Sequence, residues 1–201
     1  MKKLMMIAAM MVATLSASAQ EAGQIYLKPM VGATLSTFTG DVSDTKMKFG
    51  LVGGAEVGFK VASSFDVTAG LLAAMQGSKA KDNDYTKDAS STLTYLNIPV
   101  LANFYIVPGL AIKAGIQPGF LLSSKSKSKE KVYDTWEEVE STSKDGLNKF
   151  DLSIPVGLSY EFSNFVIDAR YNIGLTKIMK DPYPSARNSV IMLTLGYKIP
   201  F

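Results

Sequence analysis

The stretch SVIMLTLGYKIPF at positions 189–201 decides the fold class. Every second side chain in it is apolar, and it ends at an aromatic residue. Side chains of a β-strand point alternately to opposite faces, so residues of one parity form one wall. One wall of this segment is uniformly apolar: Ile191, Leu193, Leu195, Tyr197, Ile199 and Phe201. A strand of this kind is typical of a β-barrel that faces lipid.

The same alternation recurs from Gln24 onward and predicts eight strands. They are expected at residues 24–37, 47–60, 65–77, 92–107, 110–123, 149–162, 165–176 and 189–201. The connections alternate between short and long, as in an up-and-down barrel with short periplasmic turns and long extracellular loops. The predicted fold is therefore all-β, an eight-stranded antiparallel up-and-down transmembrane β-barrel in the cell outer membrane.

The placement of charges separates a membrane barrel from a soluble one. A soluble lipid-carrying barrel would also alternate, but with its apolar face inside. The apolar parity of the predicted strands carries no charge, and a charge facing hydrocarbon costs roughly 2–4 kcal/mol near the midplane. Nearly all strand glycines share the charged parity, where small residues relieve crowding in a narrow lumen. Outer-membrane lipid is therefore the expected environment of the apolar wall.

Aromatic residues on the apolar parity gather near the predicted periplasmic turns, as in the girdle that marks a membrane interface. They are Phe59, Phe65, Phe104, Tyr160, Phe162, Phe165, Tyr197 and Phe201.

The amino terminus predicts export. Lys2 and Lys3 precede an apolar run that is too short to span a bilayer, and Ala17-Ser18-Ala19 forms a small-residue cleavage site. Residues 1–19 are thus a predicted signal peptide, and residues 20–201 a single outer-membrane β-barrel domain. Removing Lys2 and Lys3 leaves 19 basic against 18 acidic residues, a net charge of +1, which does not favour nucleic acid.

Catalysis and cofactors find little support in the composition. The chain has no histidine and no cysteine, which removes histidine-dependent hydrolysis, thiolate metal sites and disulfides. Paired carboxylates remain, with Glu56, Glu161 and Asp168 as inward candidates, but neutralising lumen cations is the simpler role. We expect no enzyme activity, no catalytic residue, no metal and no cofactor.

The inward charges predict a connected layer of ion pairs that closes the lumen. Unpaired charges in a narrow interior are costly, and Arg170 is expected to reach Glu56, Glu161 or Asp168. An eight-stranded barrel also has an interior that side chains fill, although a narrow pore for small solutes stays an alternative. The expected layer comprises Glu56, Lys60, Asp66, Lys113, Glu161, Asp168, Arg170 and Lys198.

The third long loop, residues 124–148, is the predicted contact surface. It has alternating lysines from Lys125 to Lys131, then Trp136 and several glutamates. Basic and acidic arms can pair across an extended hairpin that offers edge strands and Trp136 to an extracellular protein or glycan. The alternative is a solvated loop whose charges keep it soluble.

Three stretches resemble one family. Tyr95-Leu96-Asn97-Ile98-Pro99-Val100, the start of a strand at Asp151 to Pro155, and Arg170-Tyr171-Asn172-Ile173-Gly174-Leu175 are similar to small outer-membrane barrels of the PorT type found in Bacteroidota. That family includes an accessory factor for protein secretion. The apolar positions Tyr197, Ile199 and Phe201 resemble the signal by which the barrel-assembly machinery recognises its clients.

The expected function is therefore that of a small, closed, monomeric barrel with a structural or surface-interaction role. The alternatives are an accessory role in protein secretion or envelope assembly, and a narrow small-solute pore.

Overall fold

The computed structural model describes residues 22–41, 45–81, 86–132, 135–180 and 185–201. The predicted signal peptide lies outside them. The described residues are almost entirely β-strand, and no helix among them is long and apolar enough to cross a membrane. The strands are β1 (Ile25–Gly40), β2 (Thr45–Ala62), β3 (Phe65–Ala80), β4 (Thr86–Asn97), β5 (Val100–Val107), β6 (Leu110–Val132), β7 (Thr135–Ser141), β8 (Phe150–Phe162), β9 (Phe165–Gly174), β10 (Ala186–Tyr197) and β11 (Ile199–Pro200).

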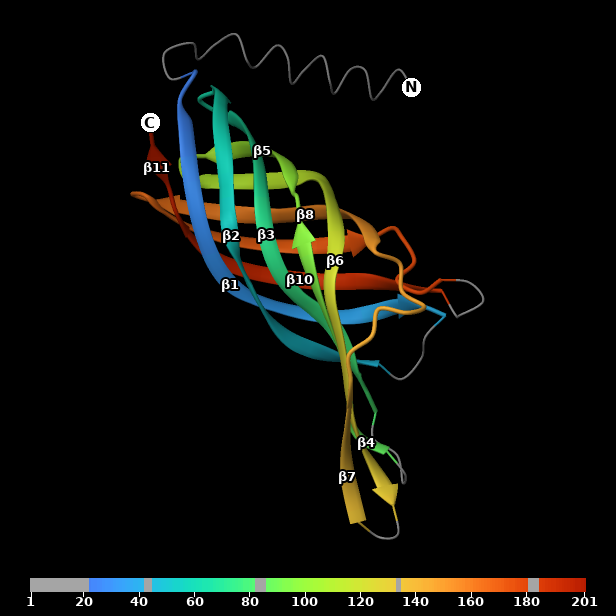
Figure 1. Cartoon of the computed structure of the whole chain (residues 1–201). Helices are drawn as coiled ribbons and strands as arrows, with labels where there is room; N and C mark the ends of the chain where they lie inside the picture. The colour runs from blue at the N-terminus through green and yellow to red at the C-terminus, as the bar shows by residue number, and fades with distance from the viewer. Residues whose placement is uncertain (1–21, 42–44, 82–85, 133–134, 181–184) are drawn as a thin grey trace.

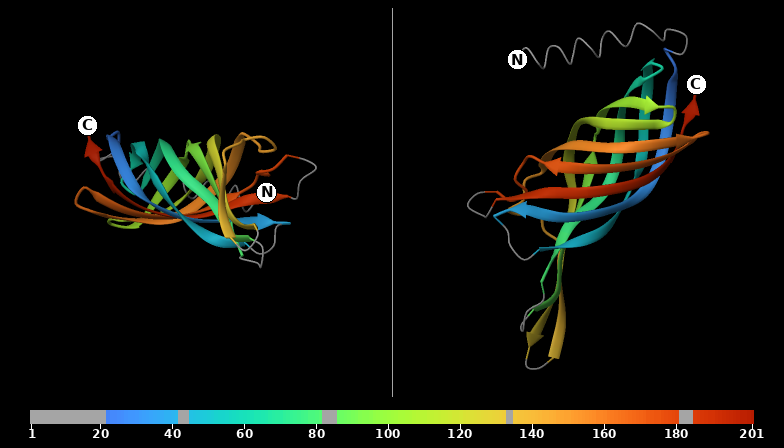
Figure 2. Two further views of the ribbon diagram at one scale, coloured as in Figure 1. Left: turned by 60° about the horizontal axis from the view of Figure 1, so that its bottom comes forward. Right: turned by 180° about the vertical axis from the view of Figure 1, so that it is seen from behind.

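The strands close into a ring, and the predicted eight-stranded antiparallel barrel is confirmed (Figures 1 and 2). The ring runs in the order β1, β2, β3, β4 with β5, β6, β8, β9 and β10, with antiparallel pairing between neighbours, and β10 returns to pair with β1 from Met30↔Gly196 to Gly40↔Ala186. The start of β1 and the carboxyl end of β11 lie at the end of the barrel that holds the short turns (Figure 1). By the orientation of such barrels, this end faces the periplasm.

Two barrel strands are interrupted, so the ring contains ten labelled elements. The predicted strand 92–107 is divided into β4 and β5 at Ile98-Pro99, because proline has no N–H to donate to the ladder. Pairing continues across the break, since Ile98 donates to the carbonyl of Pro118 and Gly70 donates to that of Pro99. The last strand is divided at Lys198, whose N–H donates to the carbonyl of Asn164.

The facing of the side chains follows the predicted parity. On β10, Leu193 is 54% exposed, whereas Met192 and Thr194 on either side are at most 2% exposed. Many large apolar side chains of the barrel strands are exposed, whereas the buried side chains include seven charged ones: Lys28, Glu56, Asp66, Lys113, Asp151, Asp168 and Arg170. A wall of this kind suits hydrocarbon outside and a polar lumen inside.

Apolar side chains fill two levels of the lumen. Met30, Val52, Leu72, Ala74 and Met192 pack together inside the barrel. Nearer the extracellular end a second cluster includes Ile178, from the segment between β9 and β10. Ile178 is buried in this cluster, and its N–H donates to the carbonyl of Ala186. The second cluster comprises Leu93, Tyr95, Leu121, Ile178 and Ala186.

At the extracellular end, β4 and β6 extend beyond the ring, and β7 pairs with β6 from Ser126↔Ser141 to Val132↔Thr135. They form a narrow sheet that projects well clear of the barrel (Figures 1 and 2). The predicted loop 124–148 therefore contains paired strands, so the solvated-loop alternative is wrong for residues 124–132 and 135–141. We call β4, β6 and β7 beyond the ring the extracellular sheet.

Candidate functional site

The centre of the lumen holds a cluster of five buried charges, which we call the central layer: Lys28, Glu56, Lys113, Asp168 and Arg170. Strand register creates part of it, since Lys28 on β1 lies directly opposite Glu56 on β2. The Lys28 ammonium is 2.7 Å from the Glu56 carboxylate, and the Arg170 guanidinium is also 2.7 Å from it. Arg170 donates two hydrogen bonds to Asp168, at 2.6 and 2.9 Å, and Lys113 pairs with the same carboxylate.

The central layer contains three cations and two carboxylates. Buried ions are tolerated when each has a partner of opposite charge. Asp168 is the hub of the layer, because it contacts Arg170 and Lys113 and lies 4.0 Å from Lys28. Loss of a carboxylate would therefore leave a larger excess of buried charge than loss of a cation.

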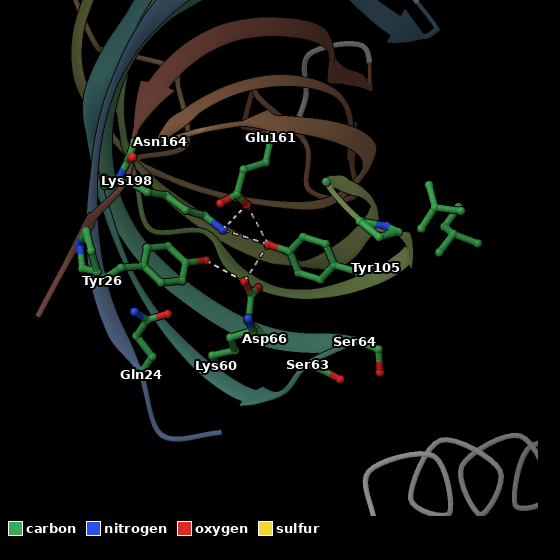
Figure 3. A pocket seen from close by; sticks show the side chains of 15 residues that line it. Gln24, Tyr26, Lys60, Ser63, Ser64, Asp66, Tyr105, Glu161, Asn164 and Lys198 are labelled. Carbon is green, nitrogen blue, oxygen red and sulfur yellow. Dashed lines mark hydrogen bonds and ion pairs between the residues drawn. The ribbon is translucent and has the colours of Figure 1, made fainter. Parts of the chain in front are cut away.

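A second cluster lies at the periplasmic mouth, where Figure 3 shows Tyr26, Asp66, Tyr105, Glu161 and Lys198. Together with Asn103, which also bonds to Asp66, we call these residues the rim layer. The Asp66 carboxylate accepts hydrogen bonds from Tyr26 at 2.8 Å and Tyr105 at 3.0 Å, and another from Asn103. The Lys198 ammonium is 2.5 Å from Glu161 and 2.9 Å from the Tyr105 hydroxyl.

Tyr26 also shapes this mouth. Its ring packs over Gly58, where an added Cβ would lie 2.0 Å from the ring carbon Cζ. The Lys198 ammonium lies 4.4 Å from the centre of the same ring, in a cation–π contact. Glycine at position 58 is thus what allows the tyrosine and the lysine to meet.

The rim layer forms the floor of a cavity of about 640 Å³ that opens at the turns. Its walls include Ser63 and Ser64 from one turn, Pro108 and Gly109 from the next, and Asn164 from the third. Lys60 lines the same cavity (Figure 3).

The expected contact of Arg170 with Glu56 or Asp168 is present, but the contacts described above do not join the expected charges into a single layer. The contacts described above form two clusters, and Arg170 reaches Glu56 and Asp168 while Glu161 pairs with Lys198. Lys28 also belongs to the central layer, although it was not in the expected set. Its inward-facing parity in the sequence could have predicted this. Tyr26, Asn103 and Tyr105 are neutral, so an inventory of charges could not find them.

The extracellular sheet carries exposed ion pairs. Lys127 is 2.9 Å from Glu140 and 3.7 Å from Glu138, and Lys129 is 2.7 Å from Asp88 on β4. The hydrogen bond from Lys127 lowers the pKa of Glu140 and raises the pKa of Lys127. Lys129 lowers the pKa of Asp88 in the same way.

Trp136, the predicted surface contact, lies on β7 with the Lys87 ammonium 4.5 Å from the centre of its ring. Among the described strands, β7 pairs with β6 alone, so its other edge has no strand partner. An unpaired edge beside an aromatic ring is a surface on which another chain can add a strand.

The residues of the predicted assembly signal lie on the outer wall. Tyr197 is 44% exposed, Ile199 38% and Phe201 80%. The Tyr197 ring meets that of Phe165 edge-on, with 5.1 Å between the ring centres, as part of the aromatic girdle. Their recognition by the barrel-assembly machinery stays a prediction.

Metal chemistry has no visible basis in the described part of the chain. No group of three or more histidine, cysteine, aspartate or glutamate residues there could hold a metal ion. The carboxylates of the two lumen layers face lysine, arginine, tyrosine and asparagine instead.

An apolar outer wall, a ring of antiparallel strands with buried charges inside it, and long extracellular strands together define a small outer-membrane barrel. The chain belongs to the family described as "Outer membrane protein beta-barrel domain", whose model matches residues 19–180. The protein is therefore an outer-membrane protein. A search of curated proteins finds no match.

One solved structure shares the fold, and two more are similar to this chain. The attachment invasion locus protein Ail of Yersinia pestis, in complex with the heparin analogue sucrose octasulfate, is 19% identical with a TM-score of 0.50, covering 89% of this chain and 99% of that one. Neisserial surface protein A is 12% identical with a TM-score of 0.48, covering 87% and 97%. OprG from Pseudomonas aeruginosa is 12% identical with a TM-score of 0.43, covering 89% and 97%.

Proposed function

We propose that this protein is a closed, non-enzymatic barrel that presents its extracellular sheet to a protein or glycan outside the cell. The observation that carries the proposal is the continuation of β4 and β6, with β7, beyond the ring. A purely structural barrel needs only loops at this position. A sheet whose edge strand carries Trp136 offers backbone hydrogen bonds and an aromatic contact to a partner.

The filled lumen supports a binding role over conduction. The central layer and the two apolar clusters occupy successive levels between the mouths of the barrel. An interior packed in this way suits a rigid support for an extracellular surface better than a solute pore.

The test removes the sheet and keeps the barrel. Ser126 and Ser141 lie directly opposite each other, so an Asn-Gly hairpin turn can replace residues 127–140. Cells that display the shortened chain should lose binding to a glycan array or to immobilised extracellular proteins that the full chain binds. Heat-modifiable mobility on gels checks that the barrel still forms. Equal binding by both chains would contradict the proposal.

The periplasmic cavity favours a second candidate, an accessory role in protein secretion or envelope assembly. A concave site at the turn end is accessible to a periplasmic component but not to an extracellular one. In a strain without the gene, Ser64→Trp should fill the cavity and fail to restore secretion. The shortened chain should restore it. The reverse pattern would contradict this role.

A further inference from the structure

Five lysines gather where strands leave the barrel at its extracellular end, and we call them the lysine patch: Lys46, Lys48, Lys79, Lys125 and Lys127. Register aligns three of them in one row. Lys46 on β2 lies opposite Lys79 on β3, Lys79 lies opposite Ser90 on β4, and Ser90 lies opposite Lys127 on β6. Directly opposed residues share a face of the sheet, so these three ammonium groups project from the same side.

The patch has a local excess of positive charge. Like charges directly opposite each other destabilise a sheet, and Lys46 and Lys79 are such a pair. Lys79 and Lys127 also act on Lys48 by electrostatic repulsion. Among the described residues that pair with the patch, Glu140 lies 2.9 Å from Lys127 and 3.9 Å from Lys125, and Glu138 lies 3.7 Å from Lys127. Asp88, which pairs with Lys129, is also within electrostatic reach of Lys79. Among the described residues, five lysines thus share three carboxylates, one of which is already paired outside the patch.

The patch begins where the lipid-facing wall ends. Phe49, Met75 and Leu122 are exposed apolar residues near it on β2, β3 and β6, at 62%, 42% and 47% exposure, and Met47, between Lys46 and Lys48, is 57% exposed. Lys46, Lys79 and Lys125 follow the first three of these within three or four positions along the strands. At about 3.3 Å per residue and a tilt of about 40°, their backbones lie about 8–10 Å beyond the apolar wall.

This height coincides with lipid head groups. The head-group region of a bilayer extends about 5–8 Å on each side of the hydrocarbon, and a lysine side chain can bend several ångströms toward the charge it prefers. Aromatic rings border the wall at both ends, with Phe162 and Phe165 in stacked contact at the periplasmic end and Phe120 against Phe150 at the extracellular end. The extracellular end adds the lysine patch.

We propose that the lysine patch binds the phosphate groups of phosphorylated lipid head groups in the outer leaflet. Phosphate oxygens accept charge-assisted hydrogen bonds from several ammonium groups at once, which relieves the repulsion within the patch. The continuity of the patch with the lipid-facing wall favours a lipid over a soluble anion, because the acyl chains then rest on Phe49, Met75 and Leu122. The inference is separate from the extracellular partner, which would contact the distal part of the sheet.

The test measures lipid binding by the mature barrel in an uncharged detergent. Native mass spectrometry counts bound lipid A that has two phosphates, and dephosphorylated lipid A serves as the matched probe. The phosphorylated lipid should bind more tightly. Lys46→Gln with Lys79→Gln should weaken that binding by about fivefold for each lysine and leave binding of the dephosphorylated lipid unchanged.

Three further variants of the protein serve as controls for lipid binding. Lys87→Gln with Lys129→Gln removes the same charge from the distal sheet and should bind as the parent does. Lys46→Arg with Lys79→Arg should retain binding. The shortened chain keeps Lys46, Lys48, Lys79 and Lys125, so it should lose the extracellular partner but keep most of its lipid binding.

The proposal would be overturned if the Lys46/Lys79 and Lys87/Lys129 glutamine variants lost the same amount of lipid binding. The loss would then depend on net charge and not on the position of the lysines. Competition by inorganic phosphate or by a soluble sulfated polysaccharide at the same concentration as the lipid would overturn it as well, since the patch would then be a site for soluble anions.

Discussion

The central layer and the extracellular sheet are built from the same kinds of residue and differ in their surroundings. In the lumen, Arg170 and Glu56 are at most 2% exposed, whereas the side chains of Lys127 and Glu140 in the sheet are 50% and 42% exposed. Breaking a buried pair strands a charge away from water, whereas breaking an exposed pair returns both ions to water. The stability of the barrel therefore depends on its ion pairs, whereas the stability of the extracellular sheet depends on them little.

The largest effect is expected for Asp168→Asn. It leaves three buried cations with one carboxylate, and we expect it to destabilise the barrel by about 3–5 kcal/mol in urea unfolding in lipid vesicles. Glu140→Asn in the sheet is the matched control and should leave the transition unchanged. A second change, Lys113→Met, should recover part of the loss in Asp168→Asn. If Asp168→Asn and Glu140→Asn lower the stability of the barrel equally, buried and exposed ion pairs do not differ in their contribution to stability.

A comparable cost is expected where a charge enters the outer wall. Val156 on β8 and Val139 on β7 are similarly exposed, at 37% and 45%, but only Val156 faces hydrocarbon. Val156→Arg should cost about 2–4 kcal/mol in the same unfolding assay. Val139→Arg should cost almost nothing. A large effect at both sites would indicate that the sheet is buried in lipid or in an assembly.

The rim layer lies between these extremes, since Lys198 and Glu161 have side chains 14% and 26% exposed. Tyr105→Phe removes the hydroxyl that donates to Asp66, and we expect a loss of about 1–2 kcal/mol. Ser128→Ala removes a hydroxyl from the sheet and should be neutral. A neutral result for Tyr105→Phe would mean that water replaces the tyrosine.

The smallest effect is the pH dependence of the sheet. The folded pKa of Glu140 lies below its ordinary value of 4.5, so its pairing contributes fully above that value and is lost as the pH falls through the lower, folded pKa. The folded pKa of Lys127 lies above 10.5, so its contribution is lost only as the pH rises beyond that value. The protection of the β7 amides from exchange, taken relative to the intrinsic exchange rate at each pH, should therefore fall below pH 4.5, and less so in Lys127→Gln.

Salt supplies the control for this last prediction. Exposed pairs are screened within about 10 Å at 0.1 M salt, so high salt should mimic the acid effect on β7. The central layer is shielded from the solution and should not respond. A salt-dependent loss of the whole barrel would contradict the division between buried and exposed pairs.

The sequence by itself determined the barrel, its strand number, its outer wall and its location. These follow from local rules, because the parity of each side chain and the lengths of the connections do not depend on which strands meet. The alternation in β10 from Val190 to Tyr197 therefore predicted the facing of that strand correctly.

Tertiary structure decided what the inward charges do. Parity places Arg170 and Glu161 in the lumen, but strand tilt and register set their depth, and neither is encoded within one strand. Register also placed Lys46 opposite Lys79 and brought Lys28 to Glu56. Contacts between residues far apart in the chain depend on the closed ring, so the two lumen layers, the periplasmic cavity and the lysine patch emerged only from the folded barrel.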